Sequence, residues 1–189
     1  GFYSIPEFCD IDNDGDYDLF IGNYDGQIYF YENAGDIENY NFIESTLSIN
    51  IEDSEYSRSA PRFIDLDDDN DFDLVLGTAT DGVSIYWNIG NEQSHQFVKD
   101  NCLDIPYFGY NVKPSIVDVD SSGSLDIIVG VSTGGFLHYK MSRFSDLNHD
   151  NDVDVSDIIM IVSEILYSND EDILCIADAN HDGNLDIFD

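Results

Sequence analysis

The stretch Asp10-Ile-Asp-Asn-Asp-Gly-Asp-Tyr-Asp18 decides the fold of this 189-residue chain, because it places a carboxylate at every second position around a glycine. Two stretches of the same form begin 55 and then 53 residues later, Asp65-Leu-Asp-Asp-Asp-Asn-Asp-Phe-Asp73 and Asp118-Val-Asp-Ser-Ser-Gly-Ser-Leu-Asp126. In each, the sixth residue is one that tolerates the positive φ of a sharp turn. These residues are Gly15, Asn70 and Gly123. The pattern predicts three loops of one conformation.

Alternating carboxylates in a short loop are the ligand arrangement that calcium prefers, since this cation takes six to eight oxygens at about 2.3–2.6 Å. We expect ligands at the first, third, fifth, seventh and ninth positions. In the three loops these are Asp10, Asp12, Asp14, Asp16, Asp18, Asp65, Asp67, Asp69, Asp71, Asp73, Asp118, Asp120, Ser122, Ser124 and Asp126. Ser122 stands where the other loops have aspartate, so the third site is expected to be the weakest of these three.

Two further acidic loops begin at Asp146 and Asp178, 32 residues apart, and each runs on to a carboxylate at its twelfth position. Their expected ligands are Asp146, Asn148, Asp150, Asp152, Asp154, Asp157, Asp178, Asn180, Asp182, Asn184, Asp186 and Asp189. The sequence therefore predicts about five calcium sites. His149 and His181 alternate with the ligand positions, so we expect both side chains to point away from the ion.

The similarity of the first three loops extends into the residues around them. A proline lies four residues before each loop. Each loop is followed by an apolar run that ends in glycine. A turn at Asp25-Gly26, Asp81-Gly82 or Gly134-Gly135 follows, then an alternating strand, as in a β-hairpin. Each repeat is thus predicted to be strand, loop, buried strand, hairpin and strand. The stretches 36–60 and 91–113 are each expected to add one outer strand, giving a mainly β fold with repeats at about 1–40, 41–95 and 96–142.

Residues 143–189 change period and are expected to form a separate segment of loop, helix, linker and loop. Its apolar residues follow helical spacing, and they are Ile158, Ile159, Ile161, Val162, Ile165 and Leu166. Asp154 and Asp157 precede them and are expected over the helix N-terminus, where carboxylates are favourable. The segment looks truncated, because no helix follows the loop that ends at Asp189.

Composition excludes several functions. The chain has 40 acidic and 6 basic residues and a formal charge of −34, which excludes nucleic-acid binding and attraction to anionic membranes. It has no run of eighteen apolar residues, so no membrane insertion is expected. With 42% hydrophobic and 13% aromatic residues it is expected to fold, more firmly with metal than without. The distant Cys9, Cys102 and Cys175 suggest no zinc site and leave open one disulfide or three free thiols.

Two alternatives concern other kinds of site. The strand aromatics are candidates for a sugar-binding face, but their recurrence in each repeat favours a place in the core. They are Tyr29, Phe30, Tyr31, Tyr86, Trp87 and Tyr139. Paired carboxylates also occur in glycosidases, but the clustered ones here are assigned to metal. No nucleophilic triad or phosphate-binding loop stands out, so we expect no catalysis.

With these loops and flanking strands, residues 6–139 resemble FG-GAP/VCBS repeats, the blades of integrin-like β-propellers. The resemblance implies three propeller-type blades in which the first, third, fifth and ninth side chains of each loop bind calcium. Residues 144–189 resemble a type I dockerin, a pair of EF-hand-like calcium-loop units that docks onto cohesin modules. Val155-Ser156 and Ile187-Phe188 depart from the small hydroxylated pairs with which dockerins usually contact the partner.

Together these features predict an extracellular or cell-surface, calcium-binding structural and interaction module for adhesion or assembly. Extracellular placement is expected because calcium sites of moderate affinity fill where calcium is millimolar. The expected partners are protein modules: upstream blades, a cohesin-like protein or further copies of the chain, with glycans as another candidate. Two alternatives remain, a non-catalytic appendage of a secreted polysaccharide-degrading enzyme and a subunit of a calcium-stabilised fibre.

Overall fold

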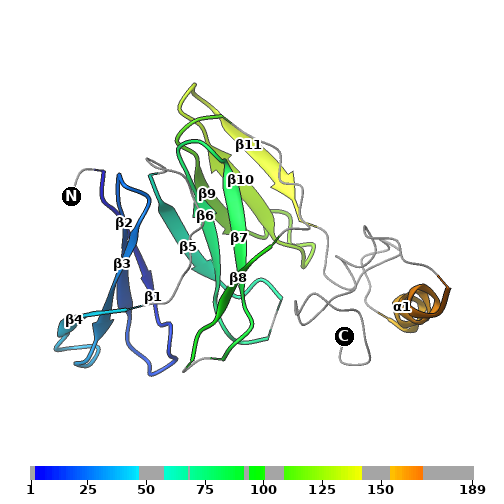
Figure 1. Ribbon diagram of the computed structural model, residues 1–189, viewed down its shortest axis with the longest axis horizontal. Helices are drawn as coiled ribbons and strands as arrows, with labels where there is room; N and C mark the ends of the chain where they lie inside the picture. The colour runs from blue at the N-terminus through cyan, green and yellow to red at the C-terminus, as the bar shows by residue number, and fades with distance from the viewer. Residues whose placement is uncertain are drawn as a thin grey trace.

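The computed structural model describes residues 3–46, 58–67, 69–91, 94–100, 109–141 and 154–167. Over these residues the chain is mainly β, with three antiparallel sheets and one helix (Figure 1). Each sheet is built from strands that are consecutive in the sequence, and each contains one of the first three acidic loops. The mainly β character predicted from the sequence is confirmed.

The first sheet has the strand order β1-β2-β3-β4, and the second repeats it as β5-β6-β7-β8. The strands of the first are β1 (Ile5–Cys9), β2 (Asp18–Gly22), β3 (Ile28–Asn33) and β4 (Phe42–Ser45). Those of the second are β5 (Ala60–Ile64), β6 (Asp73–Gly77), β7 (Val83–Asn88) and β8 (Phe97–Lys99). β4 and β8 are the outer strands expected in 36–60 and 91–113. Each pairs with the third strand of the sheet before it, so the first two sheets extend to Ser45 and Lys99, past the repeat boundaries predicted at about 40 and 95.

The third sheet has the order β11-β10-β9 in the described part of the chain. Its strands are β9 (Lys113–Val117), β10 (Asp126–Gly130) and β11 (Phe136–Lys140). Register is conserved among the sheets, because Phe8 pairs with Leu19 and Phe63 with Leu74. The hairpin turns also form as predicted, with positive φ at Gly26, Gly82 and both Gly134 and Gly135.

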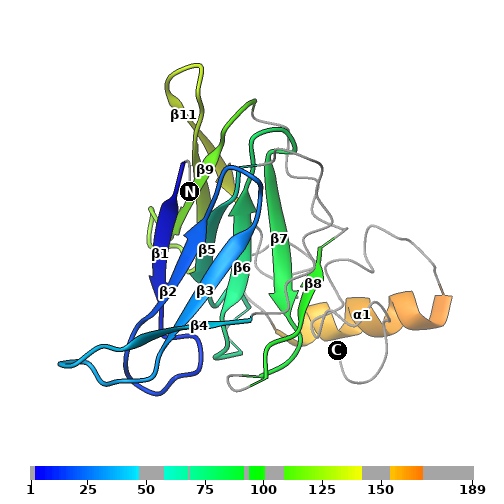
Figure 2. The ribbon, with the colours of Figure 1, turned by 60° about the vertical axis from the view of Figure 1, so that its left-hand side comes forward.

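The sheets pack face to face, with the second sheet between the other two (Figures 1 and 2). Successive side chains of a strand point to opposite faces, so β6 sends Leu74 and Leu76 toward the first sheet and Val75 toward the third. Both faces of β6 are covered, and all five of its residues are buried. Near-continuous apolar strands are the sequence signature of such a position.

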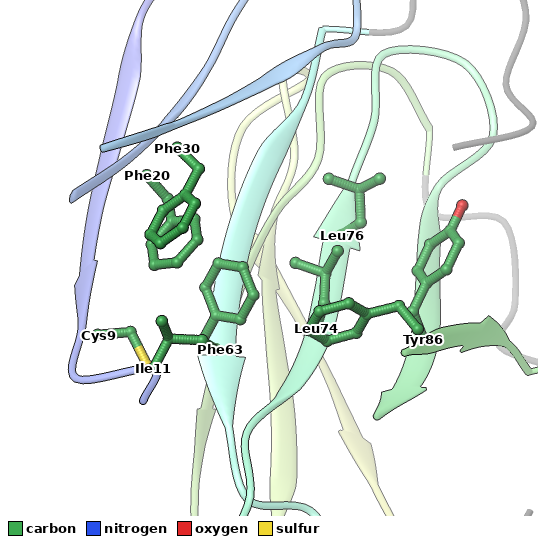
Figure 3. Close-up of a cluster of buried hydrophobic side chains, with 9 residues drawn as sticks. Cys9, Ile11, Phe20, Phe30, Phe63, Leu74, Leu76 and Tyr86 are labelled. Carbon is green, nitrogen blue, oxygen red and sulfur yellow. The ribbon is translucent and has the colours of Figure 1, made fainter. Parts of the chain in front are cut away.

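Aromatic rings fill the core between the first and second sheets (Figure 3). Phe20 stacks on Phe30 at 4.7 Å and meets Phe63 of the second sheet at 4.2 Å between ring centroids. Tyr86 is buried in the same cluster, and Trp87 lies in the core on the other side of its sheet. The core interpretation of these three strand aromatics, Phe30, Tyr86 and Trp87, is therefore confirmed, whereas Tyr29 is exposed.

Two glycines allow the sheets to approach each other closely. A Cβ on Gly22 would lie 2.8 Å from Pro61 Cδ of the second sheet, and one on Gly77 would lie 2.5 Å from Pro114 Cδ of the third. Arg62 of β5 spans the same region, since it bonds Glu7 of β1 through Nη1 and the carbonyl oxygen of Pro114 through Nε. The glycines that end the first two apolar runs are thus required by sheet packing.

The helix α1 spans Val155–Tyr167 and begins with reciprocal capping bonds. The backbone N–H of Ser156 donates to Oδ1 of Asp154, and Asp157 Oδ2 accepts from the backbone N–H of Asp154. The predicted helix and the place of both aspartates at its N-terminus are confirmed. Among the described residues, no helix has the length and apolar character needed to cross a membrane.

Candidate metal-binding loops

Each of the first three acidic loops joins the first two strands of its sheet, so these three loops occupy equivalent places in the fold. In each, three carboxylates offer oxygen atoms that lie within 4.8 Å of one another. The trios are Asp10, Asp12 and Asp14; Asp65, Asp67 and Asp73; and Asp118, Asp120 and Asp126. The structure therefore brings together nine of the predicted ligands in three groups that can each hold a metal ion.

The first aspartate of each loop fixes the backbone turn. Asp10 accepts from the N–H of Asp14 at 3.0 Å through Oδ1 and from the N–H of Gly15 at 3.1 Å through Oδ2. Asp65 and Asp118 make the same pair of bonds in the other loops. The sixth residues have the positive φ predicted for them, 97° at Gly15, 76° at Asn70 and 82° at Gly123.

The ninth aspartate anchors the loop to the sheet. Asp18 opens β2, is almost completely buried, and accepts from the N–H of Ile11 at 3.3 Å and from that of Asn33 at 2.7 Å. Asp73 does the same in the second sheet. Buried carboxylates need such partners, because burying an unpaired charge lowers the stability of the folded state by about several kcal/mol. The ninth side chain thus has a structural role as well as a possible place in a metal site.

Several carboxylate oxygens are buried in the first two loops without a hydrogen-bond partner. They are Oδ1 of Asp12, Oδ1 of Asp16 and Oδ1 of Asp71. Native proteins pair almost all buried polar atoms, and an unpaired carboxylate oxygen is the group that a bound cation satisfies. The donors are all oxygens, the preference of a hard cation such as calcium. The residues present therefore fit a calcium ion.

The carboxylates of the first two loops are crowded together, and hydrogen bonds from the protein offset their negative charge only in part. Burial, reinforced by neighbouring carboxylates, raises the pKa of Asp18, Asp67 and Asp71 to about 6 and that of Asp73 to about 8. The pKa of Asp16 is raised for the same reasons. A raised pKa means that the ionised form is unfavourable in its surroundings, so a cation bound there would stabilise it.

The third loop differs, because basic side chains reach its carboxylates. Lys140 Nζ lies 3.1 Å from Asp120 Oδ2, and His138 Nε2 lies 2.7 Å from Asp126 Oδ1. The hydrogen bond from Ser122 and the contact with Lys140 lower the pKa of Asp120 to about 2. The pKa of Asp126 is also lowered, by the N–H of Val119 first and then by His138. A protein cation thus occupies part of this trio.

Sequence reasoning missed both basic residues. The sequence predicts no role for His138 or Lys140, but strand pairing places both side chains beside the loop. The register pairs Asp126 with Lys140, so the same face of the sheet carries all three side chains. The only available signal was that three of the six basic residues, Lys99, Lys113 and Lys140, lie in the third predicted repeat.

Several predicted ligands are not members of the three carboxylate trios and make other hydrogen bonds. Asp69 Oδ1 accepts from the N–H of Asp71 at 2.9 Å, Ser122 Oγ accepts from the N–H of Ser124, and Asp154 and Asp157 cap α1. The remaining ligands of the last two loops lie outside the described residues. They are Asp146, Asn148, Asp150, Asp152, Asp178, Asn180, Asp182, Asn184, Asp186 and Asp189.

Cys9 is a buried free thiol, and burial raises its pKa, so it is unreactive in the folded chain. Cys102 and Cys175 lie outside the described residues.

Comparison with known proteins agrees with the repeated sheet-and-loop unit. Residues 10–76 match the family model of the FG-GAP-like repeat. The matched region runs from the first loop through the rest of the first sheet to the second loop and most of β6. This part of the chain is similar to FG-GAP-like repeats, as its residues predicted. A search of curated proteins found no match.

Proposed function

We propose that this chain is an extracellular, calcium-binding structural and interaction module that mediates adhesion or assembly and has no catalytic activity of its own. The observation that carries the proposal is the recurrence of a carboxylate trio at the same place in three equivalent sheets. The FG-GAP-like match supports it, because such repeats are typical of extracellular, non-catalytic interaction modules.

Calcium fits these loops better than magnesium does. Magnesium demands near-octahedral geometry and keeps several of its waters, whereas calcium accepts six to eight oxygens in flexible arrangements. Each loop offers a carboxylate trio and, in the first two loops, buried unpaired oxygens. By the same reasoning from sequence, the loops that begin at Asp146 and Asp178 each hold a further ion, giving about five, with the third site the weakest of the first three.

When bound, calcium would neutralise the clustered carboxylates. The conformation of each loop and its attachment to the sheet come from hydrogen bonds within the chain. Asp10 and Asp65 hold the turns through backbone N–H groups, and Asp18 and Asp73 connect each loop to the end of the hairpin strand. We propose that each sheet is a propeller-type blade, which calcium stiffens at the loop end.

The helix α1 supports a second candidate function, docking of the C-terminal segment onto a cohesin-like partner. Four apolar side chains of α1 are exposed, namely Val155, Ile158, Ile159 and Val162. An exposed apolar helix face is typical of a docking surface. Calorimetric titration with a type I cohesin module tests this candidate. The double variant Ile158→Asp/Ile159→Asp would abolish the heat of binding if α1 is the contact, and an absence of heat with the unaltered chain excludes it.

A calcium titration of the chain tests the main proposal. Isothermal calorimetry gives the number of ions, and thermal melting in calcium against chelator gives the stabilisation, about 2.7 kcal/mol at a hundredfold excess over Kd. Asp12→Asn combined with Asp67→Asn should remove two sites, while Asp25→Asn, in an exposed turn, should remove none. Magnesium at equal concentration controls for ionic strength. Unchanged melting and no heat with calcium would disprove the proposal.

A further inference from the structure

The two end sheets each leave one face uncovered by any other described sheet. The outer face of the first sheet consists of Phe8, Leu19, Ile21 and Tyr31, which strand register places on one side. The outer face of the third sheet consists of Val117, Ile128, Phe136 and His138, which lie together by the same argument. Because the sheets are equivalent, the packing within the chain shows what each outer face is shaped to contact.

The positions on the outer face of the first sheet form buried contacts in the other sheets. In the second sheet their equivalents pack against Phe20 and Phe30 of the first sheet, and these equivalents are Phe63, Leu74, Leu76 and Tyr86. In the third sheet they pack against the second, as Ile116, Ile127, Val129 and Tyr139. In the first sheet, Phe8 at the same position is 57% exposed. This face therefore has the composition of a sheet interface, and no sheet formed by the described residues lies upon it.

The outer face of the third sheet corresponds to the faces with which the first and second sheets contact the sheet that follows them. Phe136 is the equivalent of Ile28 and Val83, which pack in the cores of the first and second interfaces. Phe136 is 70% exposed. Ile128 is the equivalent of Phe20 and Val75, which are fully buried in those cores. The third sheet thus carries the residues with which the first two sheets contact the sheet that follows.

A glycine and a proline give independent support. Gly22 accommodates Pro61 of the next sheet, and Gly77 accommodates Pro114, at distances that a Cβ would not permit. Gly130 is the third glycine of the series, and a Cβ there would come no nearer than 4.0 Å to a described atom outside its chain neighbours, the carbonyl oxygen of Lys113. Pro6 is the first proline of the series and is exposed. Each end of the stack holds one half of a contact made twice within it.

We infer that a second copy of this chain docks head to tail, with the outer face of its first sheet on the outer face of the third sheet and Pro6 against Gly130. The inference rests on the proposed assembly function and names its partner. It continues the interface already present between the sheets, which supplies the geometry. A heterologous contact of this kind builds a ring if the rotation closes and a filament if it does not.

Charge favours the same arrangement. A formal charge of −34 opposes self-association in general. The outer face of the third sheet, however, carries Lys113 opposite Gly130 and Lys140 opposite Asp126. Lys140 is already paired with Asp120, so Lys113 is the basic side chain of this face that would meet an acidic copy.

The test is the mass of the full chain by light scattering and sedimentation, over a range of concentrations in millimolar calcium. The unaltered chain should exceed its monomer mass of 21.3 kDa. Gly130→Val and Phe136→Glu should each weaken association at least about tenfold, the effect of losing about 1.4 kcal/mol of binding. Ile37→Glu, at an exposed apolar residue of the β3–β4 connection, is the matched control and should associate normally.

A mixing experiment tests the polarity of the contact. Phe8→Glu blocks the outer face of the first sheet and Gly130→Val blocks that of the third, so each variant alone should remain a monomer. Mixed together they retain one free face of each kind and should form a 1:1 dimer that does not grow. Thermal melting of each variant shows that it is folded.

Two results would overturn the inference: a monomer at all concentrations in calcium, or association that Gly130→Val and Phe136→Glu leave unchanged. Calcium binding is measured on the same samples by calorimetry. A monomer that binds calcium refutes head-to-tail docking and leaves the calcium function standing. A chain that binds no calcium refutes the proposed function, and its mass in chelator then decides the docking separately.

Discussion

Oδ1 of Asp73 accepts a 2.9 Å hydrogen bond from the backbone N–H of Asn88, and this bond ties the second acidic loop to the end of the hairpin strand β7. Oδ2 of the same carboxylate accepts from the N–H of Leu66. Asp18 and Asn33 have the same relationship in the first sheet. The ninth residue of the loop is therefore where a metal site and the hydrogen bonding of the sheet meet, and substitutions there should affect both.

We expect Asp73→Asn to destabilise the chain even without metal. The amide replaces one acceptor oxygen by an NH₂ group that faces a backbone N–H, so a buried bond is lost, at a cost of about 1–3 kcal/mol. Urea unfolding in chelator measures the free energy of unfolding. Asp25→Asn is the control, because Asp25 is exposed in a turn. Equal unfolding midpoints for the two variants would contradict the anchoring role of Asp73.

The metal-free chain should become less stable as pH rises from about 4 to 8. The pKa of Asp67 and Asp71 is raised to about 6 and that of Asp73 to about 8, so the folded state binds more protons than the unfolded state in this window. Stability then falls with pH. Thermal melting in chelator at pH 5, 6, 7 and 8 measures the effect.

In saturating calcium the ion holds these carboxylates ionised, so the stabilisation by calcium should increase over the same pH range. A metal-free melting temperature that rises with pH would contradict this account.

Gly77→Ala should destabilise the chain strongly, while Gly130→Ala should leave the isolated chain unaffected. A Cβ at Gly77 would lie 2.5 Å from both the carbonyl oxygen of Val112 and Pro114 Cδ, so the second and third sheets must separate. Overpacking of this kind costs about 1–3 kcal/mol. The two substitutions are chemically identical and occupy equivalent positions, so a comparison of their melting temperatures isolates the contact. Similar losses for both would show that strand geometry, not sheet packing, requires the glycine.

Lys140→Met should tighten calcium binding at the third loop. Lys140 is about half exposed and its contact with Asp120 is a surface ion pair, worth about 0–1 kcal/mol. Its removal frees an oxygen of the trio and should strengthen calcium binding there by up to about fivefold. Terbium luminescence reports the filling of the loops. Lys113→Met, on the same sheet, is the control for net charge, and an equal gain in both variants would indicate a general electrostatic effect.

Much of the fold follows from short-range patterns, because loop chemistry and strand alternation are local. Gly15, Asn70 and Gly123 identify their loops by the φ values they tolerate, and the turns at Gly26 and Gly82 follow from the same argument. The start of α1 follows from Asp154 and Asp157, whose side chains bond the nearest N–H groups. All of these depend on residues within about one turn of each other.

Tertiary structure decided what depends on sheet pairing and packing. Phe30 and Tyr31 are neighbours in sequence, but only Phe30 lies in the core, because alternation turns them to opposite faces. The contacts of Lys140 and His138 with the third loop come from pairing across a hairpin. Gly22 and Gly130 have equivalent sequence positions, yet among the sheets of the described residues one lies against Gly22 and none against Gly130. Sequence alone determined the acidic loop and the first three strands of each repeat, whereas the sheet that β4 and β8 join and the position of a repeat in the stack are long-range relations that only pairing and packing set.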